Sequence, residues 1–219
     1  MKWSWRIGTL AGIDLHIHAT FPLILLWVAF SAYLTTGELA GVGRGMLLIL
    51  SLFGVVVLHE LGHALTARRY GISTRDITLL PIGGLARLEK MPDNPWQEMV
   101  VAVAGPLVNL VLAAACYLLI LLLGITYTPQ DVGQFGSPLL VNLLWINVAL
   151  AVFNMIPAFP MDGGRVLRGL LALSMDYVHA TRTAAAVGQT VAILFGFVGL
   201  LANPFLILIA LFVWMTHLP

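Results

Sequence analysis

The sequence predicts an α-helical polytopic membrane protein, and two features of its composition carry that prediction. Of its 219 residues, 60% are hydrophobic and only 10% are charged, whereas a soluble domain is about 45–50% apolar and about 25% charged. So few charged side chains could not cover the surface of a soluble domain of this length. The single cysteine excludes an internal disulfide framework, and the formal net charge of +1 gives no case for nucleic-acid binding.

Six apolar stretches are candidates for membrane-spanning helices. A transmembrane helix needs roughly 20 mostly apolar residues. The last stretch is short for a full crossing, so six spans is the leading prediction and five is the alternative. The stretches cover residues 19–36, 46–69, 99–123, 138–158, 180–202 and 204–218.

The segments between these stretches predict a small amount of further structure. β-Branched and apolar residues at 76–80 and 85–89 flank a Pro/Gly turn at 81–84, which indicates a membrane-associated β-hairpin. An amphipathic stretch at 164–173 indicates an interfacial helix between the fourth and fifth spans. No internal repeat or linker is visible, so residues 1–219 are expected to form a single domain.

The distribution of lysine and arginine predicts the orientation in the cell membrane. When the segments are assigned alternately to two sides, one side holds ten of the 11 basic residues and the other holds Arg44 alone. Because basic residues are enriched in cytoplasmic loops, both termini and the hairpin are expected on the cytosolic side. The ten residues are Lys2, Arg6, Arg68, Arg69, Arg75, Arg87, Lys90, Arg165, Arg168 and Arg182.

The second stretch contains the pattern HELGH at residues 59–63, which indicates a metal site. His59 and His63 are four residues apart and therefore lie on one face of a helix, close enough to bind one metal ion. Glu60 is placed to take a proton from a metal-bound water. The alternative is a polar helix end at the lipid headgroups, but the arginines at 68–69 mark that interface better.

The position of residues 59–63 along the second span predicts how deep in the membrane the metal would lie. Along an α-helix, His59 lies roughly 20 Å from Met46 and roughly 15 Å from Arg69. A bound metal would therefore lie within the bilayer, nearer to the cytosol. Histidine and glutamate cost free energy inside an apolar helix, so their presence at this depth indicates a functional site.

A catalytic zinc takes three protein ligands, so a third must come from another part of the chain. The remaining histidines lie near the ends of spans or outside them, whereas Asp162 follows a stretch rich in proline and glycine that interrupts the fourth span. Irregular backbone inside a membrane is expected only where it lines protein or water. Asp162 is therefore the predicted third ligand, and the alternative is that it caps a helix beginning near Gly164.

Together these motifs resemble the site-2 protease family of intramembrane zinc metalloproteases, and in particular its compact six-span prokaryotic members. Residues 59–63 match the HExxH motif of the family, and residues 154–163 match its downstream asparagine–proline–aspartate–glycine motif. Further matches are the small-residue and asparagine motif at 104–109, the hairpin at 81–84, and the strand entering the first helix at 12–21, where His18 is in register. Ala19 departs from the aromatic residue that is common there.

The resemblance implies a function and a set of roles. One Zn²⁺ per chain would be held by His59, His63 and Asp162, with Glu60 as general base, and the partners would be the lipid bilayer and a transmembrane protein substrate. The substrate would be cleaved within or near its transmembrane helix, in regulated intramembrane proteolysis. Asn154 would be an oxyanion donor or a substrate anchor by family analogy, and its alternative role is a hydrogen bond at a helix terminus.

A helical substrate hides its peptide bonds and must unwind before attack. The hairpin, with Gly83 and Gly84, could offer an edge that pairs with the extended segment, and the alternative is that it only covers the site. Gly105 and Asn109 share one helix face. For Gly105 we favour close helix packing, and for Asn109 packing and substrate contact are equal alternatives.

Two other classes of function compete with this one. A membrane zinc hydrolase of the prenyl-protein protease type also uses HExxH, but it places an acidic third ligand on a helix and not in a proline–glycine break. A non-catalytic metal-binding scaffold or a transporter would have no need for Glu60 between the two histidines.

Overall fold

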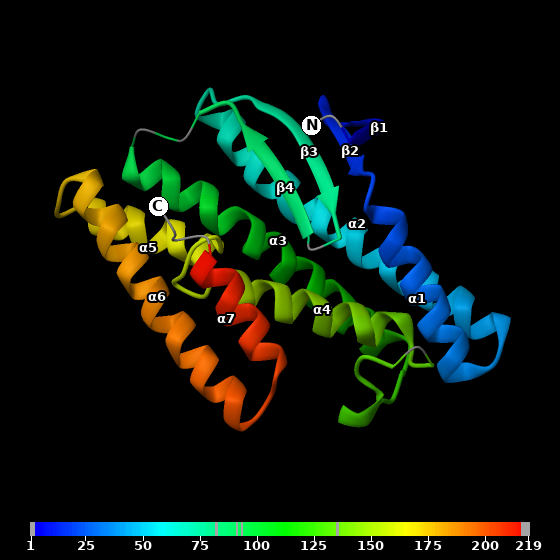
Figure 1. Cartoon of the computed structure of the whole chain (residues 1–219). Helices are drawn as coiled ribbons and strands as arrows, with labels where there is room; N and C mark the ends of the chain where they lie inside the picture. Colours follow the sequence, from blue (N-terminus) through cyan, green and yellow to red (C-terminus); the bar gives the residue numbers. More distant parts are fainter. Residues whose placement is uncertain (1–2, 82, 91, 93, 135, 216–219) are drawn as a thin grey trace.

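The computed structural model describes residues 3–81, 83–90, 92, 94–134 and 136–215. In these residues the chain forms seven α-helices, one short 3₁₀ helix (η1, Pro129–Asp131) and one four-stranded sheet. The sheet lies at the end of the helical bundle that also holds the N-terminus (Figure 1). The predicted turn residue Ile82 and the end of the last predicted span, 216–218, lie outside the described residues.

The apolar stretches form helices, and three of these are long and apolar enough to cross a membrane. The long helices are α2 (Leu39–Arg69), α3 (Pro95–Leu122) and α6 (Tyr177–Leu201). The shorter apolar helices are α1 (Phe21–Thr36), α4 (Leu139–Asn154) and α7 (Phe205–Met215). Each of the six predicted stretches thus corresponds to one helix, although α2, α3 and α6 begin before the predicted residues.

Local signals in the sequence explain where the helices begin. The side chain of Asn94 accepts a hydrogen bond from the backbone N–H of Trp96 at 2.9 Å and so caps α3, which opens with Pro95. The carboxylate of Asp176 accepts hydrogen bonds from the first two backbone N–H groups after Tyr177, each at 3.1 Å, and caps α6. Each cap satisfies donors that a helix start leaves without partners.

The predicted interfacial helix at 164–173 is α5 (Asp162–Ala172), and its buried face is made mostly of glycines. A Cβ atom on Gly163 would lie 2.4 Å from the carbonyl oxygens of Met155 and Ile156, and a Cβ atom on Gly169 would lie 2.5 Å from Cγ of Met99. The absence of side chains therefore lets α5 pack directly on α3 and on the turn that follows α4.

The sheet has the strand order β1–β2–β3–β4 (Ser4–Leu10, Ile13–His18, Thr74–Leu80 and Gly83–Leu88). The predicted hairpin is confirmed as the antiparallel pair β3–β4. The sequence did not indicate β1, nor the parallel pairing of β2 with β3, with Ile17 opposite Leu79. Two helices separate β2 from β3 along the chain, so that pairing leaves no local signal.

Helix α2 lies at the centre of the molecule, between the sheet, α1 and α3 (Figure 1). Ala64 of α2 packs in a buried cluster with Ile13 and Ile77 of the sheet. On the opposite face, a Cβ atom on Gly62 would lie 2.9 Å from the carbonyl oxygen of Ala104 in α3. Small residues let the two backbones approach closely, and this approach brings α3 to the histidines on α2.

A buried ion pair joins α5 to α3. Glu98 of α3 is fully buried, and its Oε1 accepts a hydrogen bond from Nε of Arg168 in α5 at 2.9 Å. The Arg168 guanidinium also lies 5.2 Å from the ring centre of Phe159 and 5.0 Å from that of Tyr177. Because breaking one partner of such a pair costs about 3–5 kcal/mol, the pair holds α5 and its first residue, Asp162, in one position.

Candidate metal centre

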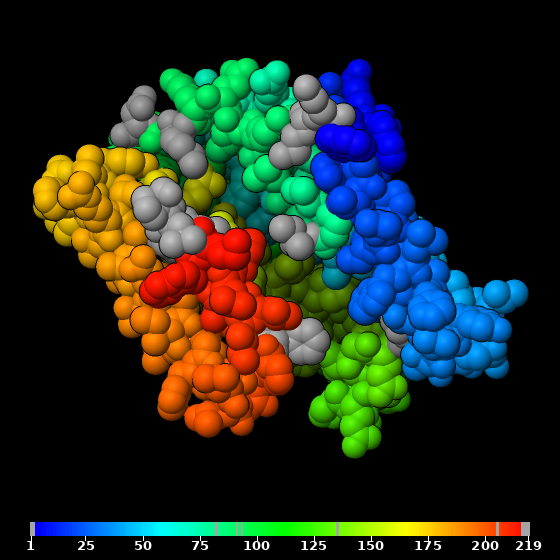
Figure 2. Space-filling model, viewed as in Figure 1, coloured from blue at the N-terminus to red at the C-terminus, as the bar shows by residue number. Residues whose placement is uncertain are grey.

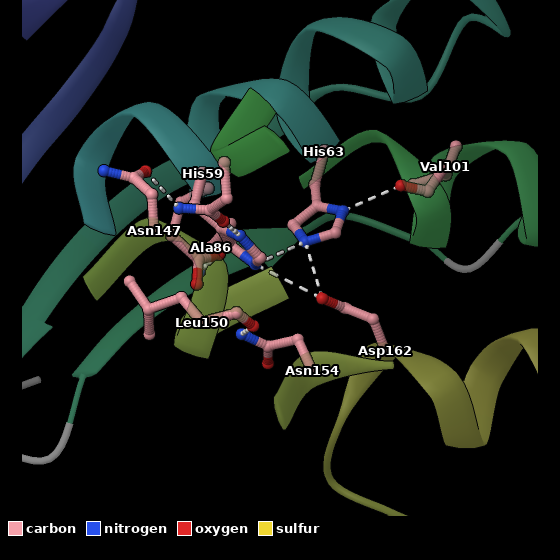
Figure 3. Close-up of polar contacts among 10 residues, drawn as sticks. His59, His63, Ala86, Val101, Asn147, Leu150, Asn154 and Asp162 are labelled. Carbon is pink, nitrogen blue, oxygen red and sulfur yellow. Dashed lines mark hydrogen bonds and ion pairs between the residues drawn. The ribbon is translucent and has the colours of Figure 1, made fainter. Parts of the chain in front are cut away.

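Three buried side chains from two helices converge on one point (Figure 3). His59 and His63 are one turn apart on α2, and Asp162 is the first residue of α5. The two Nε2 atoms are 3.1 Å apart, and each lies 3.2 Å from Oδ2 of Asp162. The residue at the N-cap position of α5 is Met161, so the predicted alternative, in which Asp162 caps this helix, does not hold.

The hydrogen bonds of the two histidines leave their Nε2 lone pairs directed at this point. Nδ1 of His63 lies 2.7 Å from the carbonyl oxygen of Val101, which can only accept, so the proton is on Nδ1. Nδ1 of His59 lies 2.5 Å from the side-chain oxygen Oδ1 of Asn109, which likewise accepts. Two lone pairs and a carboxylate oxygen at such distances repel one another, and a cation between them removes that repulsion.

The space around these atoms fits a metal ion. Ligand bonds of about 2.0–2.2 Å in tetrahedral geometry place ligand atoms roughly 3.3–3.5 Å apart, close to the separations here. Gly105 of α3 faces the same point: a Cβ atom on it would lie 2.2 Å from Nε2 of His63 and 2.7 Å from Nε2 of His59. The packing role predicted for Gly105 thus has a specific purpose, since any side chain there would occupy the space of the ion.

Glu60 lies under the β3–β4 hairpin. Its Oε2 accepts a hydrogen bond from the backbone N–H of Ala86 in β4 at 3.0 Å. A Cβ atom on Gly84 would lie 2.7 Å from Cγ of Glu60, so the absence of a side chain lets the strand lie directly on the glutamate. The carboxylate of Glu60 is therefore held by the unpaired edge of the sheet.

A cleft of about 460 Å³ joins the metal-binding side chains to Glu60. It runs between the hairpin, the end of α4 and α7, which contributes Phe212. The surface is hollowed between α7 and the hairpin (Figure 2). Seven of the eight predicted site residues line this cleft: His59, Glu60, His63, Gly83, Gly84, Asn154 and Asp162.

The two predicted asparagines lie in different places. Asn154 is the last residue of α4, and its side chain donates a hydrogen bond to the carbonyl oxygen of Leu150 at 2.9 Å while the residue lines the cleft. Its contact with substrate stays a prediction. Asn109 is fully buried behind His59, and the described residues that line the cleft do not include it. This position favours a role behind the metal ligands over direct contact with substrate.

Sequence reasoning missed three groups that hold the site residues in place. These are the carbonyl of Val101, the N–H of Ala86 and the side chain of Asn147, which hydrogen-bonds to Asn109. The first two are backbone groups, which every residue carries, so the sequence offered no signal for them. Asn147 did offer one, because an amide inside an apolar helix is costly unless it has a partner.

We predict that Gly105→Ala abolishes metal binding, because the added methyl group occupies the position of the ion. The measurement is the molar ratio of zinc to purified protein. Gly54→Ala is the matched control, since a Cβ atom at this position of α2 meets no atom within 4 Å. Stoichiometric zinc in folded Gly105→Ala would contradict the assignment of the metal position.

Comparisons with known proteins point to one protein family. The model of "Peptidase family M50" matches residues 47–136 and 130–199. "Zinc metalloprotease MJ0392" of Methanocaldococcus jannaschii is 38% identical over 98% of this chain and 59% of its own length. "Putative zinc metalloprotease sll0528" of Synechocystis is also 38% identical, over 92% of this chain and 54% of its own length. The chain thus spans between 54% and 59% of the length of these two relatives.

A solved structure shares the fold. The structure described as "Site-2 Protease from Methanocaldococcus jannaschii" superposes with a TM-score of 0.69 at 36% identity, covering 98% of this chain and 94% of that one. The resemblance indicated by the sequence motifs is therefore confirmed. This chain belongs to peptidase family M50, the site-2 protease family, whose relatives described above are named as zinc metalloproteases, and its buried His59, His63 and Asp162 could hold one metal ion.

Proposed function

We propose that this protein is an intramembrane zinc metalloendopeptidase that hydrolyses a peptide bond within or next to the transmembrane helix of a membrane-protein substrate. The observation that carries the proposal is the cleft in which Glu60 and the three metal-binding side chains meet. The names of the relatives and the family support the same chemistry. "Stage IV sporulation protein FB" of Bacillus subtilis, 26% identical over 78% of this chain, is a further relative.

Each group in the cleft has a separate role in the proposed hydrolysis. Bound zinc supplies Lewis acidity, which lowers the pKa of a water ligand to about 7 and polarises a carbonyl. Glu60 takes the proton of the attacking water and delivers it to the leaving amine. The N–H of Ala86 holds the Glu60 carboxylate toward the cleft. Asn154 lines the same cleft, which supports its proposed role in binding the substrate or its developing oxyanion.

We predict that Glu60→Gln lowers cleavage roughly 10²–10⁴-fold while zinc stays bound, because the variant loses the proton acceptor and keeps all three ligands. The assay measures cleavage of a single-span reporter helix, with zinc content determined in parallel. Glu38→Gln is the control, since Glu38 is exposed at the start of α2.

Three results would count against this assignment. Normal cleavage by Glu60→Gln would overturn the mechanism, and full zinc occupancy in Asp162→Ala would overturn that ligand. A zinc-loaded wild type that leaves every reporter intact would favour the metal-binding scaffold instead.

The unpaired edge of β4 is our proposed docking site for the unwound substrate. β4 is the last strand of the sheet, and the N–H of Ala86 points away from β3, toward the cleft. Because successive residues of a strand alternate in direction, the backbone groups of Gly84 point the same way. An extended segment paired along this edge would satisfy its own exposed backbone groups beside Glu60.

We predict that Ala86→Pro lowers kcat/KM at least about tenfold, because it removes the outward N–H that holds Glu60 and lies on the proposed docking edge, while leaving the bonds to β3 intact. Ala86→Gly is the control, since it retains the N–H. Zinc content reports whether the metal centre survives. Equal kcat/KM for the two variants would rule out pairing at this position.

For the membrane arrangement we propose six spans within one domain, in the cell membrane, with both termini in the cytosol. The six apolar helices and the asymmetry of basic residues support it. The 16 residues of α1 and of α4 correspond to roughly 24 Å each, which a locally thinned bilayer accommodates.

This arrangement predicts the outcome of cysteine labelling in a Cys116→Ala background. A membrane-impermeant thiol reagent added to intact cells should modify Gln130→Cys, in the segment between α3 and α4. It should leave Arg75→Cys, in β3, unmodified until the cells are opened. Both side chains are exposed, so access depends only on the side of the membrane. The reverse pattern would overturn the orientation.

A further inference from the structure

A chain of buried hydrogen bonds runs from the backbone of α4 to the metal-binding face of α2. Nδ2 of Asn147 donates to the carbonyl oxygen of Leu143 at 2.8 Å, and Oδ1 of Asn147 accepts from Nδ2 of Asn109 at 2.9 Å. Oδ1 of Asn109 then lies 2.5 Å from Nδ1 of His59. Asn109 is 0% exposed and Asn147 is 1% exposed, so water does not compete for these groups.

The direction of every bond in this chain follows from its first member. A backbone carbonyl can only accept, so the NH₂ group of Asn147 must face Leu143 and its oxygen must face Asn109. That oxygen requires the NH₂ group of Asn109, which turns the oxygen of Asn109 toward His59. An oxygen at this place requires a proton on Nδ1 of His59, and Nε2 is then left with the lone pair that binds a metal.

The second histidine needs no such chain. Nδ1 of His63 meets the carbonyl oxygen of Val101 directly, and that acceptor cannot reverse. An amide can reverse by half a turn, and a reversed Asn109 would present NH₂ to Nδ1 of His59. His59 would then carry its proton on Nε2, where it blocks the metal. Asn109 alone therefore does not determine which nitrogen of His59 carries the proton.

We propose that Asn147 is a positioning residue of the metal centre, which acts through Asn109 to hold His59 in the tautomer with its proton on Nδ1. Asn147 and Asp162 lie on opposite sides of His59 (Figure 3). These hydrogen bonds link α4, α3 and α2, so the packing of α4 determines which nitrogen of His59 on α2 carries the proton. The inference rests on the zinc function proposed for this site, and its tests measure metal affinity and tautomer, not cleavage.

The test is a double-mutant cycle on the zinc dissociation constant, measured by competition with a chromophoric chelator in detergent. Asn109→Leu should weaken zinc binding about 10–100-fold, the usual effect of losing the partner of a ligand histidine. Asn147→Leu should weaken it about tenfold, because Asn109 is then free to reverse. Asn109→Asp should retain most of the affinity, since a carboxylate accepts from His59 in either orientation, and the Asn147 amide then reverses to donate to it.

The double variant separates orientation from general support of the structure. If Asn147 acts by orienting the Asn109 amide, Asn147→Leu weakens zinc binding much less in the Asn109→Asp background than in the wild-type background, because a carboxylate has no orientation to lose. Equal losses in the two backgrounds would overturn the proposal. Unchanged zinc affinity in Asn147→Leu alone would also overturn the proposal. In that case zinc binding by wild type would still support the metal centre itself. Failure of wild type to bind zinc would instead overturn the proposed function.

Asn142→Leu is the matched control. Asn142 lies on the same helix and is 4% exposed, but its side chain bonds to the N–H of Gly133 and the carbonyl of Gln134. The substitution removes the same amide from α4 at a distance from the metal centre. It should leave the zinc dissociation constant unchanged, even where it lowers the unfolding temperature.

A second measurement needs no zinc and keeps the proposal testable if zinc binding is lost. In metal-free protein labelled with ¹⁵N-histidine, the Nδ1 and Nε2 shifts report which nitrogen carries the proton. The His59 signal, identified by its loss in His59→Ala, should show protonated Nδ1 in wild type and a mixture in Asn147→Leu. A neutral wild-type His59 that carries its proton on Nε2 and not on Nδ1 would contradict the chain of donors.

Discussion

The convergence of two imidazole lone pairs and a carboxylate, all within 3.2 Å of one another in a buried position, is the constraint on which the rest of this structure depends. Such a group repels itself unless a cation binds or the surrounding packing holds it together. The surrounding packing is built for that purpose. Gly62 brings α3 close to α2, and Gly105 leaves room beside Nε2 of His59 and of His63.

Asp162, the proposed third ligand, is held in place by the packing of α5. Asp162 begins a helix whose glycines pack on the turn after α4, and the Glu98–Arg168 pair ties that helix to α3. The interruption of the fourth span therefore has two consequences. It lets the chain turn back inside the protein, and it presents a carboxylate to the histidines.

In the proposed mechanism the hairpin couples the general base, Glu60, to the docking edge for the substrate. The edge strand that covers Glu60 also holds its carboxylate through the N–H of Ala86. The two sequence-based alternatives for the hairpin, a cover and a docking edge, are thus compatible with one arrangement. A substrate strand that pairs with this edge must approach the same N–H, so docking and the position of Glu60 depend on the same backbone group.

Much of the fold and the site was predictable because the signals are local. Apolar length indicated the six helices, proline and glycine between β-branched residues indicated the β3–β4 hairpin, and the spacing of His59 and His63 defined one helix face. Asp162 was predictable because a carboxylate beside a broken span is costly in a membrane unless it binds a cation or a polar partner. What the sequence determined by itself is therefore the residues proposed as ligands and as general base, and the elements that carry them.

Only the tertiary structure decided how those ligands are oriented. Four features depend on segments that are distant in the chain: the parallel pairing of β2 with β3, the carbonyl of Val101, the N–H of Ala86 and the link from Asn147 to Asn109. The physical reason is that every residue carries the same backbone groups, and an amide can donate or accept. Which group meets which partner is therefore decided only when the helices pack together.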